Sequence, residues 1–306
     1  MMPKQGATSW NARSLMKFAI DFLQEKGIEE ARRNAELLLA HALKCPRIDL
    51  YTNPTKNISK REFTLYKDLL ERRINREPLQ YIVGTANFMG LLLRVDTRVL
   101  IPRPETESLV EQVMLLCGSM DQQKTITILD IGSGSGNIPI ALAKYVKRCE
   151  VISIDVSEDA LEIARFNALL HEVADRIDFR KISVFEPIDQ ILLQRFNILV
   201  SNPPYVSSEE WDELQMEIRR YEPKQAVSDG KDGYEFHRRI LELAPYLLRA
   251  EGWLALELGF GQIDEVVKML RSQNFGNIGV SDDLEGLPRV VVAQCNPRFR
   301  NEHNKN

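Results

Sequence analysis

Four consecutive residues, Asn202, Pro203, Pro204 and Tyr205, carry groups suited to holding a planar nitrogen group. Asn202 offers its amide oxygen, and Pro203 offers a backbone carbonyl without an N–H of its own, so two acceptors stand side by side for an NH2 group. Pro204 restricts Pro203 to extended backbone, which aims that carbonyl before a substrate arrives. Tyr205 adds a flat aromatic face for a planar amide or a base. The alternative is a turn that only ends a strand.

The apolar run at residues 196–200 stands directly before these four residues. It predicts a buried strand that ends at the prolines, because proline cannot donate to a sheet ladder. In open parallel α/β sheets, ligands bind at the carboxyl edge of the strands. We therefore expect Asn202, Pro203 and Tyr205 to be catalytic, and all four residues, including Pro204, to bind substrate.

A glycine-rich turn predicts a second site. Gly132, Ser133, Gly134, Ser135 and Gly136 stand between a predicted strand at 126–131 and a predicted helix at 137–146. Glycine lets the backbone turn tightly and approach a ligand closely. The spacing Gly-X-Gly-X-Gly differs from that of dinucleotide sites, and a phosphate-binding loop with its lysine is absent from the sequence. S-adenosylmethionine carries no phosphate, so it is the cofactor we expect here, with S-adenosylhomocysteine as its product.

Three further residues are placed to support such a cofactor. Asp155 ends the next predicted strand, 19 residues after Gly136, where a carboxylate can accept both hydroxyls of a ribose. Val184 follows the third strand and is placed to cover an adenine ring. Asp130 precedes the turn and either meets the amino group of the cofactor or caps the N–H groups of the loop.

Strands and helices alternate from Thr125 onward, which predicts right-handed crossovers and a mostly parallel Rossmann-like α/β sheet. The further strands are expected at 151–155, 177–182, 196–200, 253–258 and 290–293. The further helices are expected at 160–170, 209–219, 234–248 and 262–272.

The residues before this part read as helices and then as a linker. Apolar residues recur at three- and four-residue spacing before Arg76, which predicts a small helical domain at 1–76. Strand-like segments at 79–83 and 91–95 predict a β-hairpin linker at 77–98, and the catalytic domain takes 99–306. A further helix is expected to run to about Cys117, with acids at its start that favour the helix dipole. Arg103 and Glu107 are either site residues or are explained by the electrostatics of this helix start.

Charge is divided unevenly between these parts. The net charge is −4, but residues 1–76 hold 15 Lys and Arg against 9 Asp and Glu, which leaves 25 against 35 for the rest. The basic end is either a docking surface for an acidic or nucleic-acid-associated partner or a set of solvated helix faces. The acidic remainder argues against direct binding to DNA.

Other classes of function find no support in the sequence. It contains no apolar run near the roughly 18 residues that a membrane helix needs, and we expect a cytoplasmic protein without membrane contact. The four cysteines and four histidines are scattered, which argues against a metal site and a catalytic histidine.

Several of these segments together resemble the PrmC/HemK family, the glutamine methyltransferases of peptide chain release factors. The likeness extends over nearly the whole chain and rests on the segments 78–84, 101–107, 129–137, 201–205 and 221–223. Asn-Pro-Pro-Tyr alone also occurs in adenine methyltransferases of DNA. One departure concerns Ser183, Val184 and Phe185, which stand where the family has Asp followed by an aromatic or small residue.

The resemblance implies a class I methyltransferase domain with a seven-stranded sheet, and a helical N-terminal domain that helps to grip the release factor. It implies methylation of the glutamine in the Gly-Gly-Gln motif of class I release factors. Residues 132–136, Asp155, Val184 and Asn202 would bind S-adenosylmethionine, residues 202–205 would bind substrate, and a monomer is expected. The alternatives are an adenine-N6 methyltransferase of nucleic acids and a cofactor-sensing adaptor.

Overall fold

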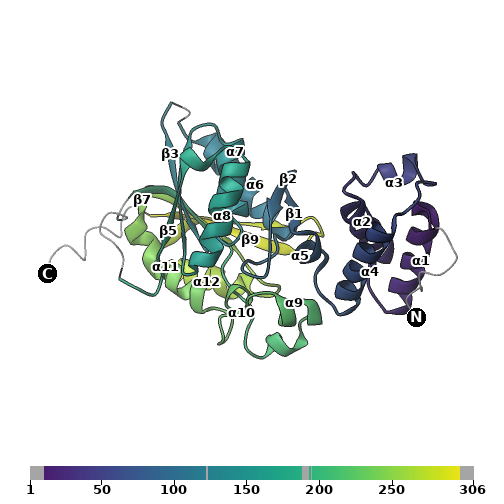
Figure 1. Cartoon of the computed structure of the whole chain (residues 1–306). Helices are drawn as coiled ribbons and strands as arrows, with labels where there is room; N and C mark the ends of the chain where they lie inside the picture. The colour runs from purple at the N-terminus through teal and green to yellow at the C-terminus, as the bar shows by residue number, and fades with distance from the viewer. Residues whose placement is uncertain (1–9, 122, 188–192, 194, 297–306) are drawn as a thin grey trace. The chain divides into compact units, whose positions relative to one another are not determined.

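The computed structural model describes residues 10–121, 123–187, 193 and 195–296. By their internal contacts the described residues form two compact units, which Figure 1 shows as ribbons. The first takes in residues up to 85 together with 215–221, and the second takes in 86–214 and residues from 222 onward. The boundaries that we place at residues 76 and 98 remain a prediction.

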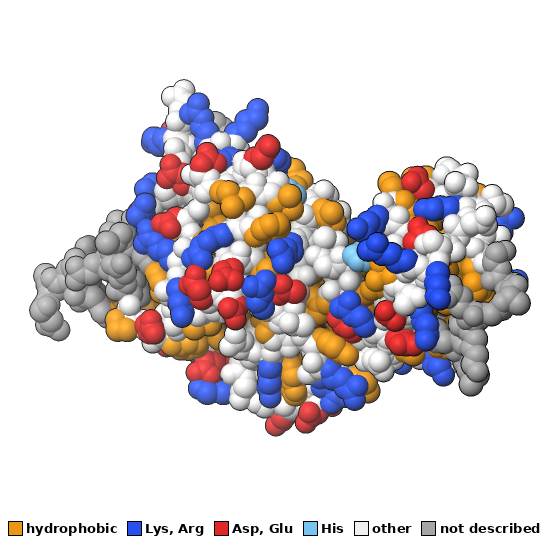
Figure 2. All heavy atoms as spheres, viewed as in Figure 1, with side chains coloured by type: hydrophobic (Ala, Val, Ile, Leu, Met, Phe, Trp, Pro, Cys, Tyr) orange, Lys and Arg blue, Asp and Glu red, His pale blue; other side chains and the backbone are white. Residues whose placement is uncertain are grey.

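The first unit is made of helices around one apolar core. Two of its helices begin with capping boxes, in which Asn11 and Ser59 exchange hydrogen bonds with Ser14 and Glu62. Each box satisfies backbone N–H groups that a helix start leaves unpaired. Lys and Arg side chains are prominent on the face of this unit that Figure 2 displays. Its helices are α1 (Ala12–Glu25), α2 (Ala31–Leu43), α3 (Asp49–Thr52), α4 (Lys60–Ile74), α5 (Leu79–Val83) and α9 (Met216–Tyr221).

Helix α5 corrects one prediction, because residues 79–83 are helical and not the first strand of a hairpin. Pro78 stands at its N-cap and Gly84 ends it with a φ of 79°, an arrangement that favours a short helix. The hairpin itself follows, with strands β1 (Thr85–Phe88) and β2 (Leu91–Arg94). Met89 and Gly90 between them both have positive φ, as a type I′ turn requires.

The second unit contains the predicted α/β sheet, with seven strands in the order β5-β4-β3-β6-β7-β9-β8. The first five of these strands are parallel, and β9 runs antiparallel to both of its neighbours, β7 and β8. The chain moves outward from β3 through β4 to β5, then returns to the other side of β3 with β6. The strands are β3 (Ile126–Ile131), β4 (Cys149–Asp155), β5 (Ile177–Lys181), β6 (Phe196–Ser201), β7 (Leu248–Glu257), β8 (Phe275–Asp282) and β9 (Pro288–Cys295).

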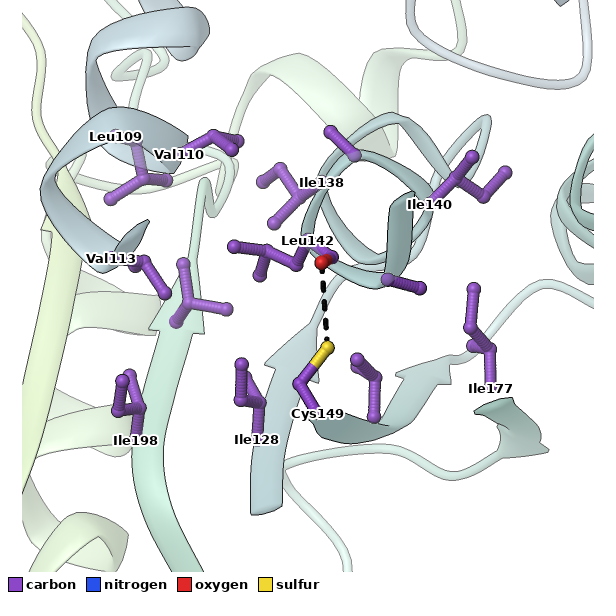
Figure 3. Close-up of a cluster of buried hydrophobic side chains, with 14 of the residues drawn as sticks. Leu109, Val110, Val113, Ile128, Ile138, Ile140, Leu142, Cys149, Ile177 and Ile198 are labelled. Atoms are coloured by element: carbon purple, nitrogen blue, oxygen red, sulfur yellow. Dashed lines mark hydrogen bonds between the residues drawn. The ribbon is translucent and has the colours of Figure 1, made fainter. Parts of the chain in front are cut away.

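Helices pack on both faces of this sheet, and each face has its own apolar cluster. Figure 3 shows one cluster, in which α6 and α7 side chains lie over β3 and β6. There the thiol of Cys149 donates to the carbonyl of Leu142, 3.4 Å away. The helices are α6 (Glu105–Ser119), α7 (Asn137–Tyr145) and α8 (Glu158–Leu170) on this face, and α11 (Glu235–Leu247) and α12 (Ile263–Ser272) on the other.

Two other predictions for this part of the chain were wrong. The helix expected at 209–219 is a 3-10 turn (Glu210–Glu213) followed by α9. Acidic residues at three- and four-residue spacing in this segment would repel one another in a continuous helix. Strand β8 was missed, because glycines and an asparagine lower its apparent strand propensity. Among the described strands it pairs with β9 alone, at the edge of the sheet.

Candidate active site

The two motifs that the sequence singled out end neighbouring parallel strands. Ile131 of β3 stands opposite Ser201 of β6 in the sheet register, so Gly132 and Asn202 emerge side by side at the carboxyl edge. A Cβ added to Gly132 would lie 3.9 Å from the backbone oxygen of Asn202. The sheet order reverses between these two strands, and such a switch point leaves a crevice for ligands. The predicted proximity of the two motifs is therefore confirmed.

The glycine loop owes its shape to left-handed backbone and close packing. Gly132, Gly134 and Gly136 have φ of 89°, 51° and 83°, values that other residues adopt only with strain. A Cβ on Gly136 would lie 2.7 Å from Cδ1 of Ile140 and 3.2 Å from Cα of Ala164. A Cβ on Gly134 meets no atom within 4 Å. The loop thus packs against α7 and α8 at Gly136 and leaves open space at Gly134.

Asp155 holds this loop from the end of β4. Its Oδ2 accepts the backbone N–H of Gly134 at 3.0 Å, and its Oδ1 accepts that of Ser157 at 2.9 Å. Each oxygen of an ionised carboxylate can accept about two hydrogen bonds, so Asp155 keeps acceptor capacity toward the cavity that it lines. It therefore has acceptor capacity left for ligand hydroxyls, and the ribose role stays a prediction.

Asp130 reaches the loop by a route that the sequence did not suggest. Its carboxyl is fully buried, and Oδ2 accepts the hydroxyl of Ser153 at 2.6 Å. The oxygens of Ser153 and Ser133 lie 2.5 Å apart, so a chain of hydroxyls joins Asp130 to the loop. Burial raises the pKa of Asp130 to about 7, the Ser153 hydroxyl opposes this rise, and Asp155 adds to it. Direct capping of the loop N–H groups by Asp130 does not occur in the described structure.

The Asn-Pro-Pro-Tyr turn is anchored at several points. The hydroxyl of Ser201 donates to the carbonyl of Ile131 at 2.7 Å, which ties the turn to β3. Nδ2 of Asn202 donates to Oγ1 of Thr106 in α6 at 3.0 Å. The Tyr205 hydroxyl donates to Oε1 of Glu257 at 3.4 Å. Burial, above all, raises the pKa of the Tyr205 hydroxyl above its usual range, so Tyr205 stays neutral at physiological pH.

A second anchor holds the backbone of Tyr205. The carbonyl of Tyr205 accepts Nε2 of Gln262 at 3.0 Å, and the same Nε2 donates to the carbonyl of Gly233 at 3.2 Å. Oε1 of Gln262 in turn accepts the N–H of Gly259 at 2.8 Å. One buried glutamine therefore joins three loops at this edge of the sheet.

These parts enclose a cavity of about 310 Å³ in the second unit. It lies over the carboxyl ends of β3, β4 and β6, and most of the predicted site residues line it. Ser133, Gly136 and Tyr205 are not in its lining, and each contributes through the packing and hydrogen bonds given above. The predicted residues that line it are Gly132, Gly134, Ser135, Asp155, Val184, Asn202, Pro203 and Pro204.

The cavity also has walls that sequence reasoning missed or left open. Phe236 of α11 lines it and packs edge-on against Phe185, with ring centroids 5.1 Å apart. Arg103 lines it too, and its guanidinium lies 2.5 Å from the buried carboxylate of Glu222. Glu222 also accepts the N–H of Ile101 at 3.2 Å. The Tyr-Glu-Pro segment at 221–223 was a signal for Glu222, whereas Phe236 had none.

Glu107, which the sequence left open as a site residue, has a structural role. Oε1 of Glu107 accepts the N–H of Met89 at 2.7 Å, so this acid fixes the hairpin turn.

Among the residues that the structure describes, no group of His, Cys, Asp and Glu side chains is arranged to hold a metal ion. In the same residues, no helix is long and apolar enough to cross a membrane.

Comparison with known proteins agrees with this architecture. Residues 14–84 match the PrmC N-terminal domain, and residues 122–251 match a methyltransferase domain. A crystal structure of a methyltransferase from Pyrococcus furiosus superposes with a TM-score of 0.50 at 18% identity, covering 68% of this chain and 90% of that one. The fold and the cavity at its switch point thus define a class I methyltransferase.

Sequence relatives specify the family. A release factor glutamine methyltransferase from Geobacter sulfurreducens is 39% identical over 282 residues, 92% of this chain and 96% of the relative. One from Chlorobaculum tepidum is 40% identical over 289 residues, 94% and 98% of the two chains. The chain belongs to the release factor glutamine methyltransferase family, as the resemblance implied.

A methyltransferase domain of this kind implies the use of S-adenosylmethionine. The residues present fit such a group. Gly134 leaves open the space that a Cβ would take, and Asp155 keeps free acceptor capacity beside it. Apolar surface for a ring comes from Val184, Phe185 and Phe236.

Proposed function

We propose that this chain transfers a methyl group from S-adenosylmethionine to the side-chain amide nitrogen of the glutamine in the Gly-Gly-Gln motif of class I release factors. The observation that carries the proposal is that Asn202 and the glycine loop share one cavity at the switch point of the sheet. Membership of the family supports the substrate, and we place the reaction in the cytoplasm.

Within this proposal residues 132–136 and Asn202 would hold the cofactor, Asp155 would accept from its ribose, and Val184 would cover its adenine. When bound, S-adenosylmethionine supplies an electrophilic methyl carbon on a sulfonium and leaves as S-adenosylhomocysteine. Phe185 and Phe236 form an aromatic wall next to Val184. Such a wall offers stacking surface for an adenine ring without the acid that the family has at position 183.

Asn202 and Pro203 prepare the substrate nitrogen for attack. The lone pair of an amide nitrogen is delocalised into the carbonyl, the resonance that gives peptide bonds a rotation barrier of about 18–20 kcal/mol. Oδ1 of Asn202 and the carbonyl of Pro203 hold the two amide hydrogens and so fix the nitrogen in position. Positive charge develops on this nitrogen as it reacts, so both hydrogen bonds strengthen in the transition state. The nitrogen then loses one proton to water, and no basic side chain is needed.

The same acceptors exclude a glutamate side chain. A carboxylate would face two oxygens with no hydrogen to share, which makes the contact repulsive. Pro204 and Tyr205 shape the turn, and the Tyr205 hydroxyl is held by Glu257 at 3.4 Å. We infer that residues 202–205 together recognise a carboxamide.

Transfer of a labelled methyl group tests the function. We expect label from tritiated S-adenosylmethionine to enter a release factor and to be lost when the glutamine of its Gly-Gly-Gln motif is replaced by alanine. DNA and a release-factor-free sample are the controls. Labelling of DNA, or labelling of the release factor that survives loss of this glutamine, would contradict the proposal. The adenine-N6 alternative predicts the DNA result, and the structure offers no observation that favours it.

The role of Asp155 is tested by binding of the cofactor product. Replacing Asp155 by alanine removes the proposed ribose acceptor, one hydrogen bond to the glycine loop at Gly134 and one to Ser157. We expect the Kd for S-adenosylhomocysteine to rise by about 10- to 100-fold, because each charge-assisted hydrogen bond contributes roughly 1.5–3 kcal/mol. Calorimetry measures this directly. Asp178, an exposed acid on β5, gives the matched control Asp178→Ala, and equal affinities in the two variants would contradict the role.

A further inference from the structure

A buried carboxyl lies behind the Asn-Pro-Pro-Tyr turn. Glu257, the last residue of β7, is 1% exposed. Its Oε1 accepts the Tyr205 hydroxyl at 3.4 Å, while Oε2 has no hydrogen-bond partner in the part of the chain that the structure describes. A buried carboxylate is costly unless it accepts hydrogen bonds. Glu257 has no role in the proposed methyl transfer so far, although it lies beside the turn that binds the substrate.

Thr106 connects this carboxyl to Asn202. It is the second residue of α6 and is 1% exposed. Its Oγ1 accepts Nδ2 of Asn202 at 3.0 Å, and its hydroxyl is close enough to the carboxyl of Glu257 to oppose the rise in the pKa of that acid. Thr106 therefore contacts Asn202 directly and lies near a carboxyl whose Oε2 lacks a hydrogen-bond partner among the described residues.

The chemistry of these groups fixes the direction of each hydrogen bond. An ionised carboxylate can only accept, so a hydrogen bond between the two groups must use the single hydrogen of Thr106 and can reach the unpartnered Oε2 of Glu257. The oxygen of Thr106 must then accept, and the NH2 group of Asn202 is the donor that faces it. An asparagine amide carries its oxygen and nitrogen on opposite sides, so Oδ1 is left for the cavity.

We propose that Glu257 and Thr106 are positioning residues that hold the side-chain amide of Asn202 with its oxygen toward the substrate. The inference rests on the proposed function, since it explains how the acceptor for the glutamine NH2 group is fixed. If the Asn202 amide were rotated by half a turn, its NH2 group would face the NH2 group of glutamine. That NH2 group would then be able to donate a hydrogen bond to a glutamate carboxylate. Thr106 and Glu257 therefore influence both the rate of methyl transfer and the preference for glutamine over glutamate.

Two substitutions at Thr106 separate this role from packing. Thr106→Val keeps the shape and removes the hydroxyl, whereas Thr106→Ser keeps the hydroxyl and removes a methyl group. We expect Thr106→Val to lower kcat by about 10- to 100-fold at saturating cofactor, the range for losing an oriented polar group near a reacting centre. Thr106→Ser should stay within about threefold of the wild type, because it retains both hydrogen bonds.

Binding measurements supply the readout that does not depend on turnover. With S-adenosylhomocysteine present, the wild type should bind a Gly-Gly-Gln peptide in preference to a Gly-Gly-Glu peptide, and Thr106→Val should lose most of this preference. Its Kd for S-adenosylhomocysteine should remain that of the wild type. Unchanged kcat and preference in Thr106→Val would overturn the inference, as would a loss confined to cofactor binding. A wild type that does not methylate release factors would instead refute the proposed function.

The pH profile tests Glu257 itself. Burial raises its pKa to about 7, Thr106, Arg289 and Tyr205 oppose the rise, and Glu105 adds to it. Nε2 of His237 lies 3.3 Å from the backbone carbonyl oxygen of Glu257, and burial lowers the pKa of this histidine. The groups that face the carboxyl are thus Arg289, Glu105 and Thr106 of α6, and Tyr205 of the turn.

Only the ionised form of Glu257 forces Thr106 to donate, so kcat should fall as the pH falls through about 7. The protonated acid can donate to Thr106 and permit the reversed amide of Asn202. Glu257→Gln cannot ionise and should have a lower kcat that lacks this acid limb. The same limb in both proteins would overturn the role of Glu257. Thermal unfolding and cofactor calorimetry at each pH show whether both proteins remain folded and loaded.

Discussion

Replacing Asn202 by alanine is expected to lower the turnover of release factor methylation by about 30- to 1,000-fold, which corresponds to roughly 2–4 kcal/mol of barrier. The variant loses the side-chain oxygen that holds one amide hydrogen of the substrate. The loss should appear in kcat at saturating cofactor and release factor, because this hydrogen bond strengthens as charge develops on nitrogen. Single-turnover transfer of a labelled methyl group measures it.

Two controls keep this result interpretable. The free energy of unfolding should change little, since Asn202 is half-buried and its described side-chain hydrogen bond goes to Thr106 alone. Asn87→Ala, which removes an exposed asparagine that accepts from Gly90 in the hairpin turn, is a matched change away from the cavity. Turnover of Asn202→Ala within about threefold of Asn87→Ala would rule out the assigned role, given that one oriented polar group at a reacting centre is worth far more.

Gly233→Ala is expected to impair both stability and turnover, although this glycine does not line the cavity. Its φ is 85°, and an added Cβ would lie 2.6 Å from the carbonyl oxygen of Tyr205 and 2.9 Å from Nε2 of Gln262. The backbone oxygen cannot move without shifting the Asn-Pro-Pro-Tyr turn. We expect the free energy of unfolding to fall by about 2–4 kcal/mol and kcat by at least about tenfold, since small displacements of reacting groups are costly.

The same loop offers a control with the same backbone strain. Gly230 has a φ of 71°, and a Cβ there would meet no atom within 4 Å. The free energy of unfolding of Gly230→Ala should therefore fall only by the cost of an alanine in left-handed backbone, about 1–2 kcal/mol. Its turnover should be unchanged. Denaturant unfolding and methyl-transfer assays on both variants separate the effect of backbone strain from the effect of the steric clash with Tyr205 and Gln262. Equal kcat values would show that the position of the turn does not depend on this contact.

Much of the fold follows from local signals in the sequence. Alternation of apolar strands and helices after Thr125 predicts the parallel sheet, and strand β3 begins and ends at the predicted residues. The errors also have local causes. Pro78 and Gly84 bound a short helix where apolar residues suggested a strand, and β8 is an edge strand with glycines that pairs with β9 alone.

The candidate site divides in the same way. Asn202 and the glycine loop were found from sequence because each carries its chemistry within a few consecutive residues. Thr106 and Phe236 were not found, because each acts through a partner far away in the chain. Thr106 is 96 residues from Asn202, and Phe236 of α11 meets Phe185 in the turn after β5. Neither pairing leaves a spacing rule in the sequence.

The sequence by itself determined the type of sheet, the glycine loop, the acceptor turn and the family that these motifs identify. Only the tertiary structure decided that Ile131 and Ser201 stand opposite each other, and that Thr106 and Glu257 lie behind Asn202. The physical reason is that turn and strand propensities act over a few residues. Side-chain contacts between distant segments depend instead on sheet register and on the packing of helices against it.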